Sequence, residues 1–259
     1  MSDIVRIENV GIRRGETRLL RGINWSIKSG EQWAILGANG SGKTSLLNTL
    51  SGFLQPTEGN IHVLGQTFGE TDWSSLRKVI GVINHTVADW INGNETALEI
   101  VVGGIHNQIN YWGRIKPEEQ QAALKVLQRY KFAYAADRTW EQMSQGERQR
   151  ALICRAIMAK FQILILDEPC AGLDPIARMR FLRFVEGLAA KKRNSPHLIL
   201  VTHHVEEITP SFTHVLVLKQ GRIFASGKKA EILNSTVLSK AFGAAISIEK
   251  HGETYNLAV

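Results

Sequence analysis

The chain has 259 residues, 44% of them hydrophobic, which is enough for one large domain with a buried core. It has no apolar run long enough to span a bilayer and no signal-peptide-like N-terminus, so we expect a soluble, cytoplasmic protein in which Cys154 and Cys170 are buried and reduced. The formal net charge of +7 comes from scattered basic residues, and a scattered charge does not by itself select nucleic acid, anionic lipid or nucleotide as a partner.

The first part of the chain is predicted to be rich in β-structure. Residues 4–9 have the alternating pattern of a strand that is expected to end near Gly11. Ile23, Trp25 and Ile27 share one face of a second strand that ends in a turn at residues 29–30. The four apolar residues of Trp33–Leu36 then predict a buried parallel strand.

A glycine-rich loop, Gly-Ala-Asn-Gly-Ser-Gly-Lys-Thr, follows this strand at residues 37–44, and a helix is expected from Thr44 to about Phe53. Glycines let successive backbone amides point inward, and the helix N-terminus adds partial positive charge, so such a loop binds polyphosphates. Lys43 can reach the β- and γ-phosphates, and the Thr44 hydroxyl can bind Mg²⁺. A chance glycine-rich turn is disfavoured by the spacing and by the strand–loop–helix context. We therefore expect a nucleoside triphosphate on the segment made of Gly37, Ala38, Asn39, Gly40, Ser41, Gly42, Lys43, Thr44 and Ser45.

Helical patterns dominate the middle of the chain. After strands at residues 61–64 and 79–83, residues 94–96 can begin one helix, and Pro117 occupies the first position of another. We interpret residues 85–160 as a helical subdomain inserted into a nucleotide-binding core of residues 1–84 and 161–259, within a single domain. The alternative is that these helices only cover the sheet.

The strand pattern resumes after the helices. Strands are expected at residues 163–166 and 198–201 with a helix at 178–188 between them, and two hairpins follow, at 215–224 and 246–257. The expected fold is therefore α/β: a P-loop nucleoside triphosphatase core with a mixed sheet, an N-terminal antiparallel β subdomain and an α-helical insertion.

Asp167 and Glu168 follow a buried strand, where ligand sites of parallel sheets form. Asp167 can hold Mg²⁺ directly or through water, and Glu168 suits a base that polarises the attacking water. An ordinary strand-exit turn is the alternative, which the upstream P-loop disfavours.

Two further segments narrow the class of P-loop nucleoside triphosphatase. Ser144 is a good N-cap for a helix that runs to about Lys160, and the amides at its start form a second anion site. His203 follows the strand at 198–201, which places a neutral imidazole near the γ-phosphate and within reach of Glu168. The adjacent His204 has no such argument and is expected to be solvated or packed.

In this order the motifs resemble those of the nucleotide-binding subunits of ATP-binding-cassette (ABC) transporters. The resemblance covers about residues 4–227. Residues 37–44 are similar to the Walker A motif, 163–168 to Walker B with its catalytic glutamate, 144–147 to the signature, 171–174 to the D-loop, and His203 to the switch histidine.

The resemblance implies an ATPase that uses ATP and Mg²⁺, with Lys43, Glu168 and His203 as its catalytic residues. It implies a head-to-tail homodimer formed on ATP binding, in which Ser144 and Gly146 of one chain close over the ATP on the other chain. Closure would drive separate transmembrane permease subunits, contacted by the helical insertion, and the chain would lie peripherally on the inner face of the cell membrane as part of an importer. No direct nucleic-acid partner is expected.

Three positions depart from the family pattern. The signature, usually Leu-Ser-Gly-Gly-Gln, is Met-Ser-Gln-Gly-Glu at residues 143–147, so that Glu147 adds an anion near a phosphate. His85 stands where the family has its Q-loop glutamine, and it can still hold a metal-bound water. Arg14 stands at the adenine-stacking aromatic position, where its planar guanidinium can stack on the base with weaker discrimination.

The segments 167–174 and 202–208 also resemble a subgroup described as molybdenum- or iron-type transport ATPases. Two functions compete with transport: a soluble ABC protein that acts on DNA or ribosomes, and a regulatory protein that hydrolyses ATP slowly. A single cassette with a short insertion disfavours the first, and the intact Lys43, Asp167, Glu168 and His203 disfavour the second.

Overall fold

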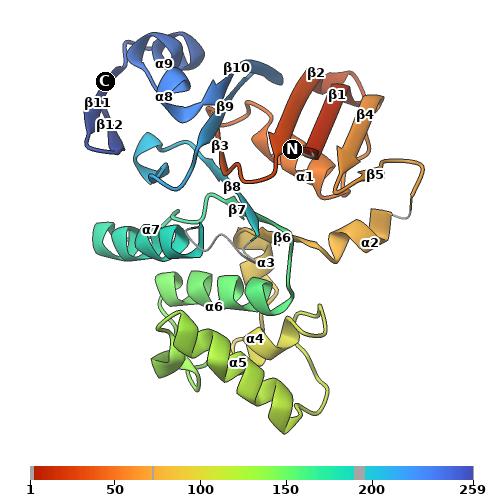
Figure 1. Ribbon diagram of the computed structural model, residues 1–259, viewed down its shortest axis with the longest axis vertical. Coiled ribbons are helices and arrows are strands. Elements are labelled where there is room, and N and C mark those ends of the chain that lie inside the picture. The colour runs from red at the N-terminus through yellow and green to blue at the C-terminus, as the bar shows by residue number, and fades with distance from the viewer. Residues whose placement is uncertain (1–2, 72, 190–195, 259) are drawn as a thin grey trace. The chain divides into compact units, whose positions relative to one another are not determined.

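The computed structural model describes residues 3–71, 73–189 and 196–258, and it divides the chain into two compact units (Figure 1). The first unit contains residues 1–77 and 197–259, and the second contains residues 78–196. These boundaries enclose two strands with the helices of the second unit, so a separate subdomain at 85–160 stays a prediction.

The first unit is rich in β-structure. Its elements are β1 (Asp3–Arg14), β2 (Thr17–Lys28), β3 (Trp33–Leu36), α1 (Lys43–Leu50), β4 (Glu58–Val63), β5 (Gln66–Thr67), α2 (Trp73–Arg77), β8 (His197–Thr202), η2 (Val205–Glu207), β9 (His214–Lys219), β10 (Arg222–Lys228), α8 (Lys229–Ile232), α9 (Ser235–Phe242), β11 (Ser247–His251) and β12 (Thr254–Ala258). An antiparallel sheet with strand order β2-β1-β4-β5 confirms the expected β subdomain. Ile23, Trp25 and Ile27 are buried on its inner face, as their spacing predicts.

A mixed arrangement of strands surrounds β3 in the same unit. β3 is parallel to β8 on one side and to β9 on the other, and β10 is antiparallel to β9. All four residues of β3 are buried, which explains its unbroken apolar sequence. Leu36 pairs with Thr202 of β8 and with Val217 of β9, so the carboxyl ends of β3 and β8 lie side by side.

The second unit is mainly helical. Its elements are β6 (Ile80–Ile83), α3 (His85–Asp89), α4 (Ala97–Gly103), α5 (Pro117–Arg129), η1 (Ala133–Ala135), α6 (Gln145–Met158), β7 (Ile163–Asp167) and α7 (Pro175–Ala189). Helices α4, α5 and α6 pack together in Figure 1, and β6 pairs in parallel with β7. Thr96 caps α4 and Pro117 begins α5, as the sequence predicts. Burial of Cys154 raises its pKa to about 12, which leaves that thiol unreactive.

Local backbone geometry explains where the expected boundaries were wrong. β1 continues to Arg14 instead of ending near Gly11, because a bulge at Asn9, whose φ is +50°, lets the strand resume. Helix α1 ends at Leu50 instead of Phe53, because Gly52 adopts a φ of +74°. Helices α8 and α9 had no counterpart in the expected elements.

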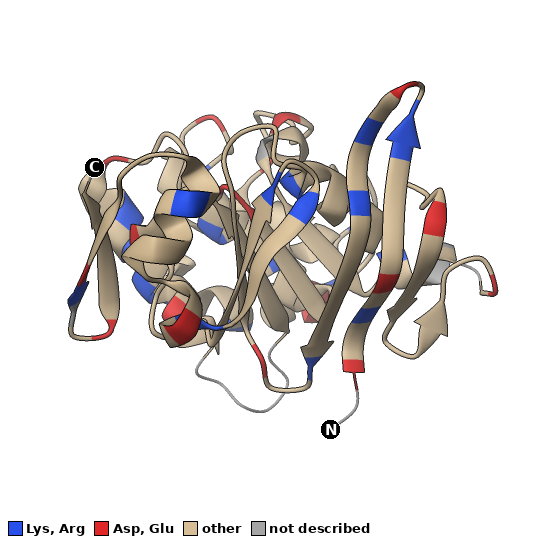
Figure 2. Cartoon of the chain, turned by 90° about the horizontal axis from the view of Figure 1, so that it is seen from above, with Lys and Arg blue, Asp and Glu red and all other residues tan. Residues whose placement is uncertain are grey.

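Charged residues are dispersed over strands, helices and loops, as Figure 2 shows, in keeping with the scattered basic residues of the sequence. Within the described ranges, none of the helices is both long and apolar enough to cross a bilayer.

Candidate functional site

The conformation of the P-loop depends on Gly37 and Gly42, where a larger residue would clash or be strained. A Cβ on Gly37 would lie 2.5 Å from Ser41 Oγ and 2.7 Å from the carbonyl oxygen of Leu218. Gly42 has a φ of +108° and directly precedes helix α1, whose first turn carries no acidic residue. The first amides of such a helix have no partner within the helix, so they are available to an anion.

Lys43 and Ser41 supply the side-chain groups of this loop. Lys43 is only 7% exposed, and its Nζ donates to the carbonyl oxygens of Gly37 at 2.8 Å and Ala38 at 3.3 Å. Ser41 Oγ is buried and has no hydrogen-bond partner within the described part of the chain. Thr44 is exposed on the first turn of α1. A buried hydroxyl without a partner beside a lysine ammonium fits a phosphate oxygen.

A cavity of about 200 Å³ lies against the P-loop. Its wall combines the loop with the β9–β10 turn and the end of α9, namely Gly37, Ala38, Asn39, Gly40, Ser41, Leu218, Lys219, Gln220, Ala241 and Phe242. The sequence analysis did not predict the last five of these residues as part of the site. The β9–β10 turn was located in the sequence, but its approach to the P-loop depends on the pairing of β9 with β3.

Thr202 is the last residue of β8 and pairs with Leu36, the last residue of β3. His203 and the P-loop therefore follow neighbouring strand ends. The turn after β8 is braced: Thr202 Oγ1 donates to Glu207 Oε2 at 2.6 Å, and the His204 amide donates to Thr202 Oγ1 at 3.0 Å. Glu207 is buried, whereas His204 is exposed, as expected. The structure therefore brings two of the expected motifs to one edge of the sheet.

Arg14 is exposed at the end of β1, next to the β1–β2 turn. The paired strand β2 passes the P-loop, since a Cβ on Gly42 would lie 3.0 Å from Leu20 Cδ2 and 3.2 Å from the carbonyl oxygen of Leu19. Arg14 therefore lies on the hairpin whose second strand passes the phosphate loop, and its contact with a base stays a proposal.

In the second unit, Asp167 and Glu168 follow β7. Asp167 is the last residue of the strand, and both side chains are half-buried. Glu168 has a φ of +49°, a left-handed conformation that is uncommon for a residue other than glycine. Strain of this kind, on the order of 1–3 kcal/mol, concentrates at functional sites.

His85 is the first residue of helix α3, which Asn84 caps by accepting the Val87 amide at 2.9 Å. The His85 side chain lies outside the described residues, so its place in a metal shell stays a prediction. Among the side chains that the structure describes, no three His, Cys, Asp or Glu residues form a metal cluster. Single oxygen donors such as Thr44 and Asp167 fit Mg²⁺, which keeps several waters and binds through phosphates.

Ser144 caps helix α6, and the signature segment adjoins the D-loop. Gln145 Nε2 donates to the carbonyl oxygen of Ala171 at 2.8 Å, and a Cβ on Gly172 would lie 2.8 Å from Gln145 Oε1. Asp174 accepts the amides of Ile176 and Ala177 at 2.9 Å each, which begins helix α7. Gly146 lies in the first turn of α6, with Ser144 exposed before it.

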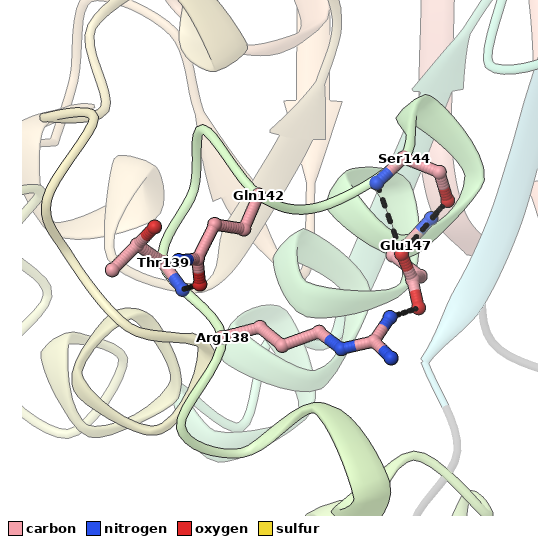
Figure 3. Close-up of polar contacts among 5 residues, drawn as sticks. All are labelled: Arg138, Thr139, Gln142, Ser144 and Glu147. Carbon is pink, nitrogen blue, oxygen red and sulfur yellow. Dashed lines mark hydrogen bonds and ion pairs between the residues drawn. The ribbon is translucent and has the colours of Figure 1, made fainter.

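Glu147 is bound within the chain (Figure 3). It accepts the amide and the hydroxyl of Ser144 at 2.9 Å each, and Arg138 Nη1 lies 2.7 Å from its other oxygen. Partial burial raises the pKa of Glu147, but the hydrogen bonds from Ser144 and the charge of Arg138 outweigh it, and the pKa is lowered. The carboxylate is therefore ionised at neutral pH and serves as the third residue of a capping box.

The sequence analysis did not identify two exposed tryptophans as candidate functional residues. Trp90 is 61% exposed and Trp112 is 82% exposed. Asn110 connects their segments, since its side chain accepts the Asn92 amide and donates to the Trp90 carbonyl, both at 2.8 Å. Trp112 lines a cavity of about 170 Å³ together with Asn92, Asn94, Glu95, Glu99, Asn110 and Tyr111. The sequence signal that could have identified them is the presence of tryptophans in a segment without apolar periodicity.

Comparisons with known proteins support the family that the sequence motifs indicate. A family profile described as "ABC transporter" matches residues 20–171. An ABC transporter ATP-binding protein of Bacillus subtilis is 39% identical over 246 residues, covering 95% of this chain and 93% of the relative. A hemin import ATP-binding protein of Pseudomonas aeruginosa is 29% identical over 262 residues and covers 96% of each chain.

Solved structures show the same fold. An inward-facing structure of a putative metal-chelate type ABC transporter matches with a TM-score of 0.79 and 25% identity, covering 100% of this chain and 96% of the other. A dimeric ATP-binding cassette in a post-hydrolysis state with ADP and Pi matches with a TM-score of 0.71 and 26% identity, covering 86% of this chain and 98% of the other.

Proposed function

This chain belongs to the ABC transporter family as an ATP-binding ATPase subunit, and we propose that it powers import through separate membrane subunits. The observation that carries the proposal is the P-loop. Its Lys43 is buried, and its Ser41, whose hydroxyl has no hydrogen-bond partner among the described residues, lines a cavity. The loop follows β3, which pairs with the strand that precedes His203. A soluble ABC protein acting on nucleic acid has no comparable support, because charge is dispersed over the chain.

We assign the phosphates of ATP to the amides of residues 37–45 and to the Lys43 ammonium. Thr44 and Asp167 would hold Mg²⁺, which would neutralise charge that develops on the phosphates during transfer. Glu168 would accept a proton from the attacking water, and His203 would donate a hydrogen bond to the terminal phosphate. Arg14 would stack on the adenine.

We further propose that the complete site needs two chains. Ser144 has an exposed hydroxyl, and the first amides of α6, including that of Gly146, have no partner within the helix. One chain can offer this helix start as an anion site to the ATP of another chain. The dimeric cassette with ADP and Pi supports this arrangement. The homodimer would form when ATP binds and separate after hydrolysis.

The permease subunits are proposed to bind the second unit at Trp90 and Trp112. Large exposed aromatic side chains beside a cavity are typical of interface anchors. The chain would then lie on the inner face of the cell membrane without entering it. A hemin importer and a metal-chelate type transporter among the similar proteins support import of a metal chelate, in line with the iron- or molybdenum-type resemblance.

Size-exclusion chromatography of Glu168→Gln tests this function. The variant keeps the P-loop but loses the charge that polarises water, so with ATP and Mg²⁺ it is expected to accumulate as a dimer. Adding Ser144→Arg should return it to a monomer. A monomeric Glu168→Gln protein, together with parent protein whose turnover per chain is independent of protein concentration, would contradict the proposal.

A further inference from the structure

Arg138 is fixed beside the signature segment, residues 143–147. Its carbonyl oxygen accepts the Ala97 amide at 3.0 Å, which ties its backbone to helix α4. Its guanidinium carbon lies 5.5 Å from the centre of the Tyr134 ring, and the next residue, Thr139, donates its amide to Gln142 Oε1 at 3.2 Å. The guanidinium is thereby held where it reaches Glu147 (Figure 3).

The two oxygens of Glu147 have different partners. Oε1 accepts Arg138 Nη1 at 2.7 Å, whereas Oε2 accepts both the amide and the hydroxyl of Ser144. A serine hydroxyl has one proton, so Ser144 cannot donate it to Glu147 and to a phosphate at the same time. Glu147 therefore competes with the nucleotide for the proton that the proposed two-chain site requires.

We propose that Arg138 is a positioning residue for nucleotide binding, because it neutralises Glu147 and so releases the Ser144 hydroxyl to the terminal phosphate of an ATP held by a second chain. The inference rests on the proposed contact of Ser144 with that ATP. When the hydroxyl hydrogen turns toward a phosphate, Ser144 Oγ can still accept the Glu147 amide, so the helix cap is kept. The Glu147 carboxylate keeps the Ser144 amide and Arg138, and it also has a hydrogen bond with Tyr134. Without Arg138, the carboxylate hydrogen-bonds the hydroxyl more strongly and repels the triphosphate.

Steady-state kinetics of Arg138→Gln test this role. The KM for ATP is expected to rise roughly three- to tenfold, with kcat at saturating ATP nearly unchanged, since an exposed ion pair of this kind is lost while the catalytic groups remain. Arg138→Lys should restore most of the affinity because it keeps the charge. Arg129→Gln, which removes an exposed charge elsewhere in the same unit, is the matched control.

Combining Arg138→Gln with Glu147→Gln tests whether Arg138 acts through Glu147. Glutamine also completes a capping box, so helix α6 should begin as before. Glu147→Gln alone should lower the KM for ATP, and it tests the inference even if Arg138→Gln does not fold. In that background Arg138→Gln should have little further effect. An equal rise of KM in both backgrounds would overturn the inference, because Arg138 would then act independently of Glu147.

Ser144→Ala separates this inference from the proposed function. A raised KM in Ser144→Ala with an unchanged KM in Arg138→Gln would refute the role of Arg138 and leave the two-chain site standing. An unchanged KM in Ser144→Ala would refute the contact itself, and the inference with it.

Discussion

Leu36 and Thr202 are paired on the neighbouring parallel strands β3 and β8, so the P-loop and His203 leave the same edge of the sheet side by side. The carboxyl edge of a parallel sheet is where ligands bind in α/β proteins. This pairing brings two motifs that are far apart in the sequence to one edge of the sheet, where we propose the nucleotide site.

Lys43→Ala is expected to abolish measurable ATPase activity. We propose that Lys43 binds the phosphates, and each charged hydrogen bond contributes about 1.5–3 kcal/mol. ATP affinity should fall at least roughly tenfold in calorimetric titration. Parent-like affinity and turnover in this variant would refute the P-loop assignment.

Arg14→Ala should weaken ATP binding a few-fold, and Arg14→Tyr should restore it. Stacking at a partly exposed site contributes only about 0.5–1 kcal/mol. Equilibrium titration with a fluorescent ATP analogue measures the change, with Arg18→Ala on the paired strand as a control. If Arg14→Ala binds as tightly as the parent, Arg14 is a surface residue without a role in base binding.

Trp112→Ala should reduce co-purification of the chain with its permease from detergent-solubilised membranes. Truncating a central aromatic anchor costs about 2 kcal/mol or more of binding energy. Phe224→Ala, which removes an exposed aromatic side chain of β10 in the other unit, is the control. Equal recovery of the permease with all three proteins would exclude Trp112 from the interface.

The stability of the parent relative to Glu147→Gln should depend on pH. Hydrogen bonds from Ser144 and the charge of Arg138 outweigh partial burial and hold the Glu147 pKa below its ordinary value of 4.5. A carboxyl with a lowered pKa stabilises the fold above its ordinary pKa, and this contribution is lost as the pH falls through the lowered one. The parent should therefore be more stable at pH 7, by up to about 1 kcal/mol, and the difference should vanish in acid. Thermal melts at a series of pH values measure it, and a pH-independent difference would contradict the assignment.

Local chemistry made much of the fold predictable. The unbroken apolar run of β3, the turn after β2 and the capping residues Ser144 and Thr96 all act within a few residues, so the sequence indicates them directly. By contrast, Glu147 could be interpreted only as an added anion, because its partner Arg138 lies in a separate loop whose approach depends on the packing of α4. The wall of Ala241 and Phe242 beside the P-loop depends in the same way on where α9 docks.

Mixing two inactive variants and measuring ATP hydrolysis tests whether one ATP site is built from two chains. Lys43→Ala lacks the P-loop cation, and Ser144→Arg blocks the signature surface, so each alone should be inactive. In a head-to-tail heterodimer, the intact P-loop of the Ser144→Arg chain faces the intact Ser144 of the Lys43→Ala chain. An equimolar mixture is expected to regain ATPase activity, up to roughly half of the parent rate, because each heterodimer carries one complete site of two. A mixture no more active than its separate components would contradict the two-chain site.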